Sequence, residues 1–438
     1  MKNRLTNKRF ISVFEYGLMS ADSKAIESDN VVHIPAAAFD YLEKCCLCDN
    51  SESRFINLKV KHGMKVLQLK NYAGVVFCPD GTQIEVLPKV AKLNDDENSK
   101  ELARKSLLMM MKSLKQFRHI ETEVASIEKQ RMPLMEVFIS QFLMSVNYLI
   151  KKGIKSDYVR TQNNNAFLKG KLIHSKQLKY NFVNKQKFYI EFDEYIVNRA
   201  ENRLLHSALI KIAGYTQRTK NKKLLQELLL AFDTVPICKC YKQDFLQINI
   251  QRGMKYYDAP INWARLILEG FSPQSMKGAH NAYSLLFPME AVFESFVAKY
   301  LKSKLSKLVT LTTQIQSKKL VTYNEKGYFK LKPDIHITTP QSKAIVLDTK
   351  WKLIDQNASQ GKDKFGLSQS DFYQMLGYGF NYLNSEGELV LIYPKTETFT
   401  KPFKYSFNFD DSERLKLRVM PFDISPNCRE RIDLQLII

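Results

Sequence analysis

Two short alternating runs joined by a tight turn constrain the fold of this chain most strongly. YFKLKPDIHI (328–337) and AIVLDTKWK (344–352) are separated by six residues that contain the turn TPQSK, and this pattern predicts an antiparallel pair of strands. If Gln341 is the centre of the turn, Asp334 lies directly opposite Asp348. Their Cβ atoms would then be about 5 Å apart.

The residue types on these strands predict a metal-dependent hydrolytic site. Side chains alternate along a strand, so Asp348 and Lys350 point to the same face. Two carboxylates as close as Asp334 and Asp348 repel each other unless a cation lies between them. Mg²⁺, or Mn²⁺ in its place, takes oxygen ligands from one or two carboxylates and adds water and phosphate. Asp334 and Asp348 are thus expected to bind metal, and Lys350 to position water and stabilise charge on a phosphodiester.

One helix is predicted before these strands in the sequence and another after them. PMEAVFESFVAKYLKSKL (288–305) has Pro288 at a suitable first position and an apolar stripe, with Glu294 at the edge of that stripe. We expect Glu294 to complete the metal shell. Downstream, SDFYQMLGYGFNYL places Gln374 and Tyr378 on one helix face, where they could orient Lys350 or contact DNA. The order of Glu helix, Pro-Asp strand, Asp-x-Lys strand and helix is the PD-(D/E)xK nuclease signature.

The change of periodicity along the chain predicts an α+β protein with three parts. Residues 1–150 are predicted to form a β-rich domain with helices, because alternating runs such as INLKVKHGMKVLQL precede helical spacing. Residues 151–265 are predicted to be a mostly helical connector, with SDYVRTQNNNAFLKGK as a turn-rich stretch before helices. Residues 266–438 are predicted to be the α/β PD-(D/E)xK endonuclease domain.

Charge and hydropathy indicate the class of partner. Sixty-six Lys and Arg face 45 Asp and Glu, and the net charge of +21 attracts polyanions such as DNA, RNA or an acidic membrane. The sequence MKNRLTNKRF shows no signal-peptide apolar region, and no run reaches the roughly 20 apolar residues of a membrane span. A cytoplasmic protein without membrane contact is expected.

Segments across most of the chain resemble one family. PMEAVFESF, LKPDIHI, VLDTKWK and DFYQMLGYG resemble the McrC subunit of McrBC-type, modification-dependent restriction systems. The resemblance extends upstream, in the same order, to FEYG, NYAGVVFCPDGTQIEVLPKV, FLKGKL and DEYIVNRAENRLL.

This resemblance implies a division of labour between two polypeptides. The C-terminal domain would be a type IV restriction endodeoxyribonuclease subunit acting on methylated double-stranded DNA. Its partner would be a McrB-like AAA+ GTPase hexamer that recognises methylcytosine and uses the GTP. Residues 1–150 would dock into that ring and stimulate GTP hydrolysis. The chain has no G-x-x-x-x-G-K-[ST] phosphate loop, which agrees with a separate nucleotide motor.

Two other functions fit the same residues. One is a stand-alone PD-(D/E)xK nuclease in repair or defence. The other is a non-catalytic assembly factor whose basic surface holds DNA. The aspartate, aspartate and lysine trio argues against the second, and an adjacent AAA+ GTPase gene would argue against the first.

Overall fold

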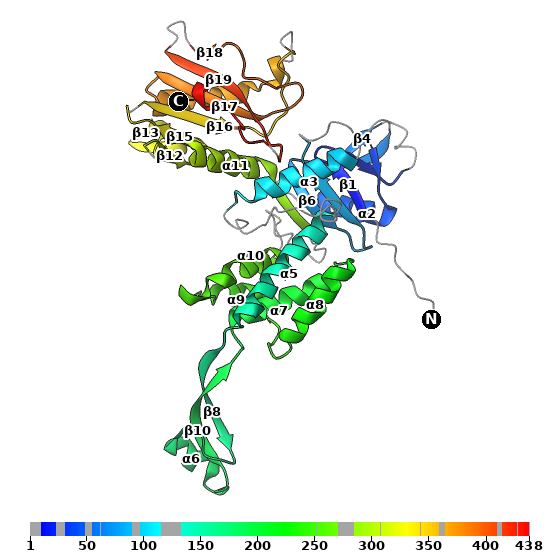
Figure 1. The fold of residues 1–438 in the computed structure, drawn as a ribbon, viewed down its shortest axis with the longest axis vertical. Helices are drawn as coiled ribbons and strands as arrows, with labels where there is room; N and C mark the ends of the chain where they lie inside the picture. The colour runs from blue at the N-terminus through cyan, green and yellow to red at the C-terminus, as the bar shows by residue number, and fades with distance from the viewer. Residues whose placement is uncertain are drawn as a thin grey trace. The chain divides into compact units, whose positions relative to one another are not determined.

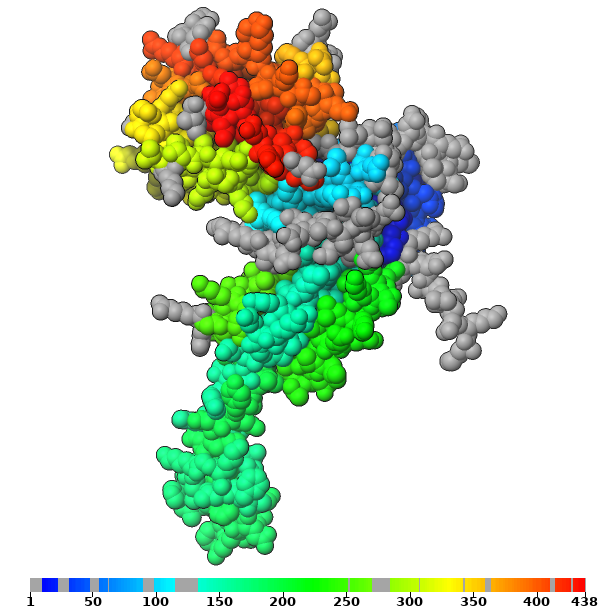
Figure 2. All heavy atoms as spheres, viewed as in Figure 1, coloured from blue at the N-terminus to red at the C-terminus, as the bar shows by residue number. Residues whose placement is uncertain are grey.

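The computed structural model describes most of the chain as two compact units (Figures 1 and 2). One unit is Met1–Leu134 together with Ser272–Ile438, and the other is Met135–Phe271. The described residues are 10–22, 31–48, 55–61, 63–89, 97–114, 133–250, 252–269, 284–306, 308–341, 343–358, 364–409, 414–426 and 428–437.

Among its described residues, the N-terminal part of the first unit contains two four-stranded sheets and two helices. One sheet has the order β1 (Phe10–Phe14), β7 (Gln83–Leu87), β6 (Tyr72–Phe77), β11 (Ser284–Pro288). The other has the order β3 (Val31–His33), β2 (Leu18–Ser20), β5 (Met64–Leu69), β4 (Ile56–Lys61). The helices are α2 (Ala36–Cys48) and α3 (Glu97–Met111). Apolar side chains from both sheets and α2 form one core, which includes Met19, Leu42, Leu67 and Ile84.

The C-terminal part of this unit is built on a six-stranded sheet. Its order is β12 (Thr310–Thr313), β15 (Ile335–Thr338), β16 (Ala344–Thr349), β17 (Gly387–Pro394), β19 (Leu415–Phe422), β18 (Phe407–Asn408). A separate two-stranded ribbon is formed by β13 (Lys319–Tyr323) and β14 (Lys326–Lys330). The helical elements are α11 (Met289–Lys304), α12 (Gln369–Tyr382) and the short turns η4 (Lys364–Gly366) and η5 (Leu434–Leu436).

Strand β11 joins the two parts, because it comes just before α11 in the chain but pairs with β6 of the N-terminal sheet. Leu286 pairs with Gly74 in this antiparallel ladder. Gly74 has a φ of +143°, and a Cβ added there would lie 1.8 Å from the carbonyl oxygen of Leu285. The two backbones therefore approach closely only because residue 74 has no side chain.

A buried polar cluster also connects the N-terminal part to the chain after β16. The indole Nε1 of Trp351 donates to both carboxylate oxygens of Glu15, at 3.1 and 3.0 Å. The backbone N of Lys89 donates to Glu15, and the Lys89 ammonium donates to the carbonyl oxygen of Trp351 at 3.1 Å. Trp351 and Glu15 are both buried. Residues far apart in sequence thus hold the backbone directly after Lys350.

The second unit combines helices with a small sheet. Its helical elements are α5 (Leu134–Lys152), which begins in the first unit, α6 (His174–Asn181), α7 (Ala200–Ala213), α8 (Thr219–Ala231), α9 (Tyr241–Leu246), η3 (Arg252–Tyr257) and α10 (Asp258–Glu269). The sheet has the order β8 (Asp157–Asn165), β10 (Phe188–Ile196), β9 (Lys171–Leu172). Within this unit the long antiparallel pair of β8 and β10 extends away from the helices α7 to α10 (Figure 1). Buried Glu136 of α5 accepts from the backbone N of Arg218 and so helps to satisfy the start of α8.

The predicted α+β class is confirmed, but individual elements differ from the sequence expectations. Helix α2 lies inside the segment predicted to be β-rich. The stretch predicted to be turn-rich forms β8, and DEYI, which lies in the range predicted to be mostly helical, belongs to β10. Strand β8 is mostly exposed, and β10 exposes three consecutive residues, Asp193 to Tyr195, so both lack the one-sided apolar alternation that marks a strand.

The contacts group the chain differently from the three predicted ranges, 1–150, 151–265 and 266–438. The N-terminal sheets belong to the same unit as the C-terminal domain. Residues 1–150 therefore could not be removed without exposing the edge of β11 and the side chain of Trp351. In the described part of the chain, every helix is too short or too polar to span a membrane.

We predict that Gly74→Ala destabilises the first unit by about 3 kcal/mol or more, because the added methyl group would collide with the backbone of β11. Gly63→Ala is the matched control, since Gly63 also has a positive φ (+75°) but faces open space. The control should cost only about 1 kcal/mol. Urea unfolding followed by Trp351 fluorescence in a Trp263→Phe background measures both, and equal losses would contradict the close approach of β6 and β11.

A second prediction concerns pH. Burial raises the pKa of Glu15 to about 7, against the attraction of Lys89. An acid whose pKa is higher in the folded state takes up a proton on folding. The resulting stability is fully present below about pH 4.5, the ordinary carboxyl value, and is lost as pH rises through about 7. In the natural chain this pH rise should lower the free energy of unfolding by up to about 3 kcal/mol. In Glu15→Gln that decrease should be absent.

The measurement is the free energy of unfolding of the natural chain and of Glu15→Gln at about pH 5 and about pH 8. Groups that do not interact with Glu15 contribute equally to both proteins, so the difference isolates Glu15 together with its partner Lys89. Parallel pH profiles would show that Glu15 titrates alike in the folded and unfolded chains.

Candidate active site

The candidate residues gather at the carboxyl end of β16. This strand lies inside the sheet, antiparallel to β15 and parallel to β17. From Ile345 to Thr349 every residue of β16 is buried. A central strand with this run of apolar side chains fixes its last residues in place, and Asp348 is one of them.

The predicted register of the hairpin is confirmed. Ile335 pairs with Leu347, and Thr338 pairs with Ala344, so residue 341 is the centre of the turn. The ladder ends at the pair of Ile335 and Leu347, and Asp334 is the residue before Ile335, so the same register leads toward Asp348. The Oδ2 of Asp334 accepts hydrogen bonds from the backbone N and the hydroxyl of Thr349, both at 2.7 Å. These bonds hold the Asp334 carboxylate at the end of β16.

Asp348 is a buried acid in an unusual electrostatic environment. Its side chain is 1% exposed and forms an ion pair with the ammonium of Lys350. Its Oδ2 makes no further hydrogen bond of ordinary geometry to any residue that the structure describes. Burial and the charge of Asp334 raise the pKa of Asp348 to about 7, while Lys350 opposes the rise. Bringing another positive charge to this carboxylate is therefore electrostatically favourable.

A chain of hydrogen bonds orients Lys350. The Nζ of Lys350 donates to Oε1 of Gln374 at 2.9 Å, and Nε2 of Gln374 donates to the hydroxyl of Tyr378 at 2.7 Å. Tyr378 in turn donates to the carbonyl oxygen of Lys332 at 3.0 Å. Burial lowers the pKa of Lys350, but the attraction of Asp348 outweighs this and holds it above its ordinary value. Lys350 thus stays protonated and pointed toward Asp348.

Glu294 lies near the two aspartates but has a different partner. Its Oε1 accepts from Nε2 of Gln314 at 2.7 Å. Burial and the charge of Asp334 raise its pKa, and Lys332 and Lys350 lower it. Among the described residues, no three His, Cys, Asp or Glu side chains are arranged to hold a metal ion. The geometry therefore groups Asp334 with Asp348 and leaves Glu294 at the edge.

The two aspartates fit a hard divalent cation. They offer carboxylate oxygens, Oδ2 of Asp348 lacks a hydrogen bond within the described chain, and their mutual repulsion needs a positive charge. Mg²⁺ is held by only one or two carboxylates in many phosphoryl-transfer sites, with water and phosphate in the other positions. A third carboxylate is therefore not required.

Several residues that hold the segment after Lys350 in place were not predicted from the sequence. Lys352 donates to both oxygens of Asp371 on α12, at 3.1 and 2.9 Å, and the Tyr393 hydroxyl also donates to Asp371. Trp351 contacts Glu15 on the other side. The string DTKWK contains two of these residues, Trp351 and Lys352. Their partners lie on other strands and helices and cannot be predicted from this string.

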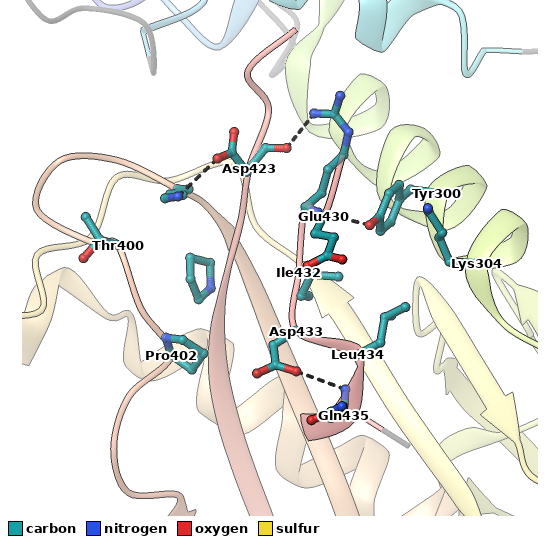
Figure 3. A pocket seen from close by; sticks show the side chains of 13 residues that line it. Tyr300, Lys304, Thr400, Pro402, Asp423, Glu430, Ile432, Asp433, Leu434 and Gln435 are labelled. Carbon is teal, nitrogen blue, oxygen red and sulfur yellow. Dashed lines mark hydrogen bonds and ion pairs between the residues drawn. The ribbon is translucent and has the colours of Figure 1, made fainter. Parts of the chain in front are cut away.

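A pocket of about 590 Å³ lies elsewhere in this unit, beside the carboxyl ends of β17 and β19 (Figure 3). Tyr300 and Lys304 of α11 line one side of it, and Lys395 pairs with Asp423 at 3.2 Å. None of the six candidate residues lines this pocket. It is therefore distinct from the arrangement at β16.

Comparison with solved structures supports the fold. A chain in the refined half-complex from a tetradecameric assembly of Thermococcus gammatolerans McrB AAA+ hexamers with bound McrC is similar, with a TM-score of 0.67 and 19% identity. The match covers 95% of each chain. A chain in the Thermococcus gammatolerans McrBC complex has a TM-score of 0.51 and 21% identity, and the match covers 68% of this chain and 89% of that one.

Sequence comparison identifies the family. No curated protein matches significantly. The description "McrBC 5-methylcytosine restriction system component" belongs to the family that matches residues 67–394, well over half of the chain. The match includes Glu294, Asp334, Asp348, Lys350, Gln374 and Tyr378. The chain therefore belongs to the McrBC 5-methylcytosine restriction system component family.

Proposed function

We propose that this chain is the DNA-cleaving subunit of a modification-dependent restriction complex, with Asp334, Asp348 and Lys350 at its nuclease site. The observation that carries the proposal is the ion pair of buried Asp348 with Lys350, next to Asp334, whose carboxylate accepts hydrogen bonds from Thr349. A solvated surface hairpin would have no reason to bury a carboxylate beside a second one, because the desolvation cost is several kcal/mol.

Each residue has a role that follows from its contacts. Asp334 and Asp348 would hold Mg²⁺, or Mn²⁺, which when bound supplies positive charge at a phosphodiester and makes its water more acidic. Lys350 would stabilise the negative charge that develops on the phosphate, since its ammonium is already oriented by Gln374. Gln374 and Tyr378 would act as positioning residues. Glu294, at the edge of the site, would bind a water molecule in the coordination shell of the metal.

The proposal includes a partner. The family and the two Thermococcus gammatolerans complexes support pairing with a McrB-like AAA+ GTPase hexamer that uses the GTP and selects methylated DNA. Docking and GTPase stimulation by residues 1–150 remain part of the proposal. Because β11 pairs with β6, that region is better tested by surface substitutions than by deletion.

We predict that Asp348→Asn and Lys350→Ala each reduce DNA cleavage by at least about a thousandfold, since each removes charge from the reacting centre. The matched controls are Asp423→Asn and Lys395→Ala, which break an ion pair at the same edge of the sheet but outside the site. Cleavage of methylated duplex DNA with partner and GTP is the measurement. Strong cleavage by Asp348→Asn would remove Asp348 from the site.

The same assay tests the metal. Cleavage should require Mg²⁺ or Mn²⁺, and Ca²⁺ should support DNA binding with little turnover. Mg²⁺ should also raise the melting temperature of the natural chain in the absence of DNA, and this shift should be absent in Asp334→Asn. Cleavage that continues in excess EDTA would contradict a metal-dependent mechanism.

We also predict that the chain alone cuts unmodified duplex DNA at a small fraction of the rate seen on methylated DNA with partner and GTP. The reason is that the proposed GTP-driven ring would deliver methylated DNA to the site, so the site would meet DNA much less often without the ring. Rates with and without partner, GTP and methylation measure this. Equal cleavage by the chain alone would instead favour the stand-alone nuclease.

A further inference from the structure

An exposed ribbon leads directly into the candidate active site. Strands β13 and β14 pair only with each other, and all their residues are exposed except Gly327, which is half-buried. After β14 the chain passes through Leu331 and Lys332 to Pro333 and Asp334. The yellow part of the chain that contains this ribbon reaches the molecular surface in Figure 2.

The ribbon carries a concentrated positive charge. Residues 318–332 contain one acidic residue, Glu325, and five exposed lysines, which are Lys318, Lys319, Lys326, Lys330 and Lys332. Among the described residues, none of these lysines forms an ion pair. The excess of four positive charges is therefore available to an external anion.

Large apolar side chains share the ribbon with the lysines. Tyr323 is 76% exposed and Phe329 is 73% exposed. Phe329 also has a φ of +55°, a left-handed conformation that an aromatic residue rarely adopts. No core packing in the described unit explains this conformation, because the ring lies largely in solvent. A backbone outlier of this kind, five residues before Asp334, points to a functional constraint.

Hydrogen bonds anchor the base of the ribbon to helix α12. The backbone N of Leu331 donates to the carbonyl oxygen of Lys318 at 3.0 Å. The hydroxyl of Tyr382 donates to the carbonyl oxygen of Leu331 at 3.1 Å, and that of Tyr378 donates to Lys332. Tyr378 also holds Gln374, the partner of Lys350. The ribbon and the catalytic lysine thus share one support, so an anion bound on the ribbon has a fixed position relative to the site.

We propose that the β13–β14 ribbon binds duplex DNA beside the bond to be cut, with its lysines on the phosphates and its exposed aromatic rings against the groove. The inference rests on the proposed nuclease function. A two-stranded ribbon fits the major groove, and lysines contact phosphates without reading sequence. The ribbon would therefore place DNA in the site without choosing the sequence, which leaves selection of modified DNA to another element.

The test compares two triple variants of the full chain that remove the same chemical groups. The first is Tyr323→Ala, Lys326→Ala, Lys330→Ala on the ribbon. The second is Lys401→Ala, Lys404→Ala, Tyr405→Ala on the segment after β17, where Tyr405 is 74% exposed. Both lose two lysines and one exposed tyrosine. Affinity for a fluorescent duplex is measured over a range of salt concentrations with Ca²⁺ in place of Mg²⁺.

We expect the ribbon variant to bind duplex DNA at least about tenfold more weakly, with the slope of log affinity against log salt reduced by about two, one unit for each lost phosphate contact. The control should change neither quantity. Equal effects of the two variants would show a general charge effect and overturn the proposal. Unchanged DNA affinity of the ribbon variant, with or without a loss of the partner's GTPase stimulation, would overturn it too.

A single substitution tests the aromatic contact without the risk that the ribbon unfolds. Phe329→Gly removes the ring at a position where glycine adopts the observed φ without strain, so the ribbon should stay folded. We expect weaker DNA binding with an unchanged melting temperature, and full affinity would remove the aromatic part of the proposal. Since binding is measured without turnover, a chain that binds DNA through the ribbon but never cuts it would refute the nuclease function and not this inference.

Discussion

The burial of the Asp348 carboxyl group is the constraint on which the rest of the site depends. An isolated carboxylate in the interior is unfavourable by several kcal/mol, and the neighbouring Asp334 adds repulsion. The ion pair with Lys350 offsets only part of this, since the pKa of Asp348 is still raised to about 7. The Asp348 carboxyl group is therefore stabilised by any further positive charge brought to it. Under the proposed function, a bound metal cation would supply that charge in place of a proton.

This constraint explains why so many contacts converge on the short segment after β16. The backbone N of Lys350 donates to the carbonyl oxygen of Ile392, which continues the pairing with β17. The next residue, Trp351, is held by Glu15 and Lys89, and Lys352 is held by Asp371. A long lysine side chain loses much rotamer freedom when it is fixed. Fixing its backbone on both sides reduces the number of further interactions needed to keep the ammonium beside Asp348.

The sequence predicted the local part of this arrangement and not the distant part. The register of β15 with β16 depends only on a short turn and the alternation of strands, so counting residues from Gln341 was sufficient. The contact of Glu15 with Trp351 joins residues 336 positions apart, and no periodicity encodes such a distance. The strand β11 was missed for the same reason, because its partner β6 lies more than 200 residues upstream. In β8 and β10 the exposed residues on both faces removed the usual signal.

Apolar packing beneath the site offsets the free-energy cost of burying charged groups there. Phe293 of α11 lies 5.3 Å from the ring of Trp351 and 5.9 Å from that of Phe422, between ring centroids. All three side chains are buried, and each contributes about 1.5–3 kcal/mol through the removal of apolar surface from water. Glu294 is the next residue after Phe293 on the same helix. One helix thus packs the core with one side chain and brings a carboxylate toward Asp334 with the next, so the apolar packing of α11 also sets the position of charge at the site.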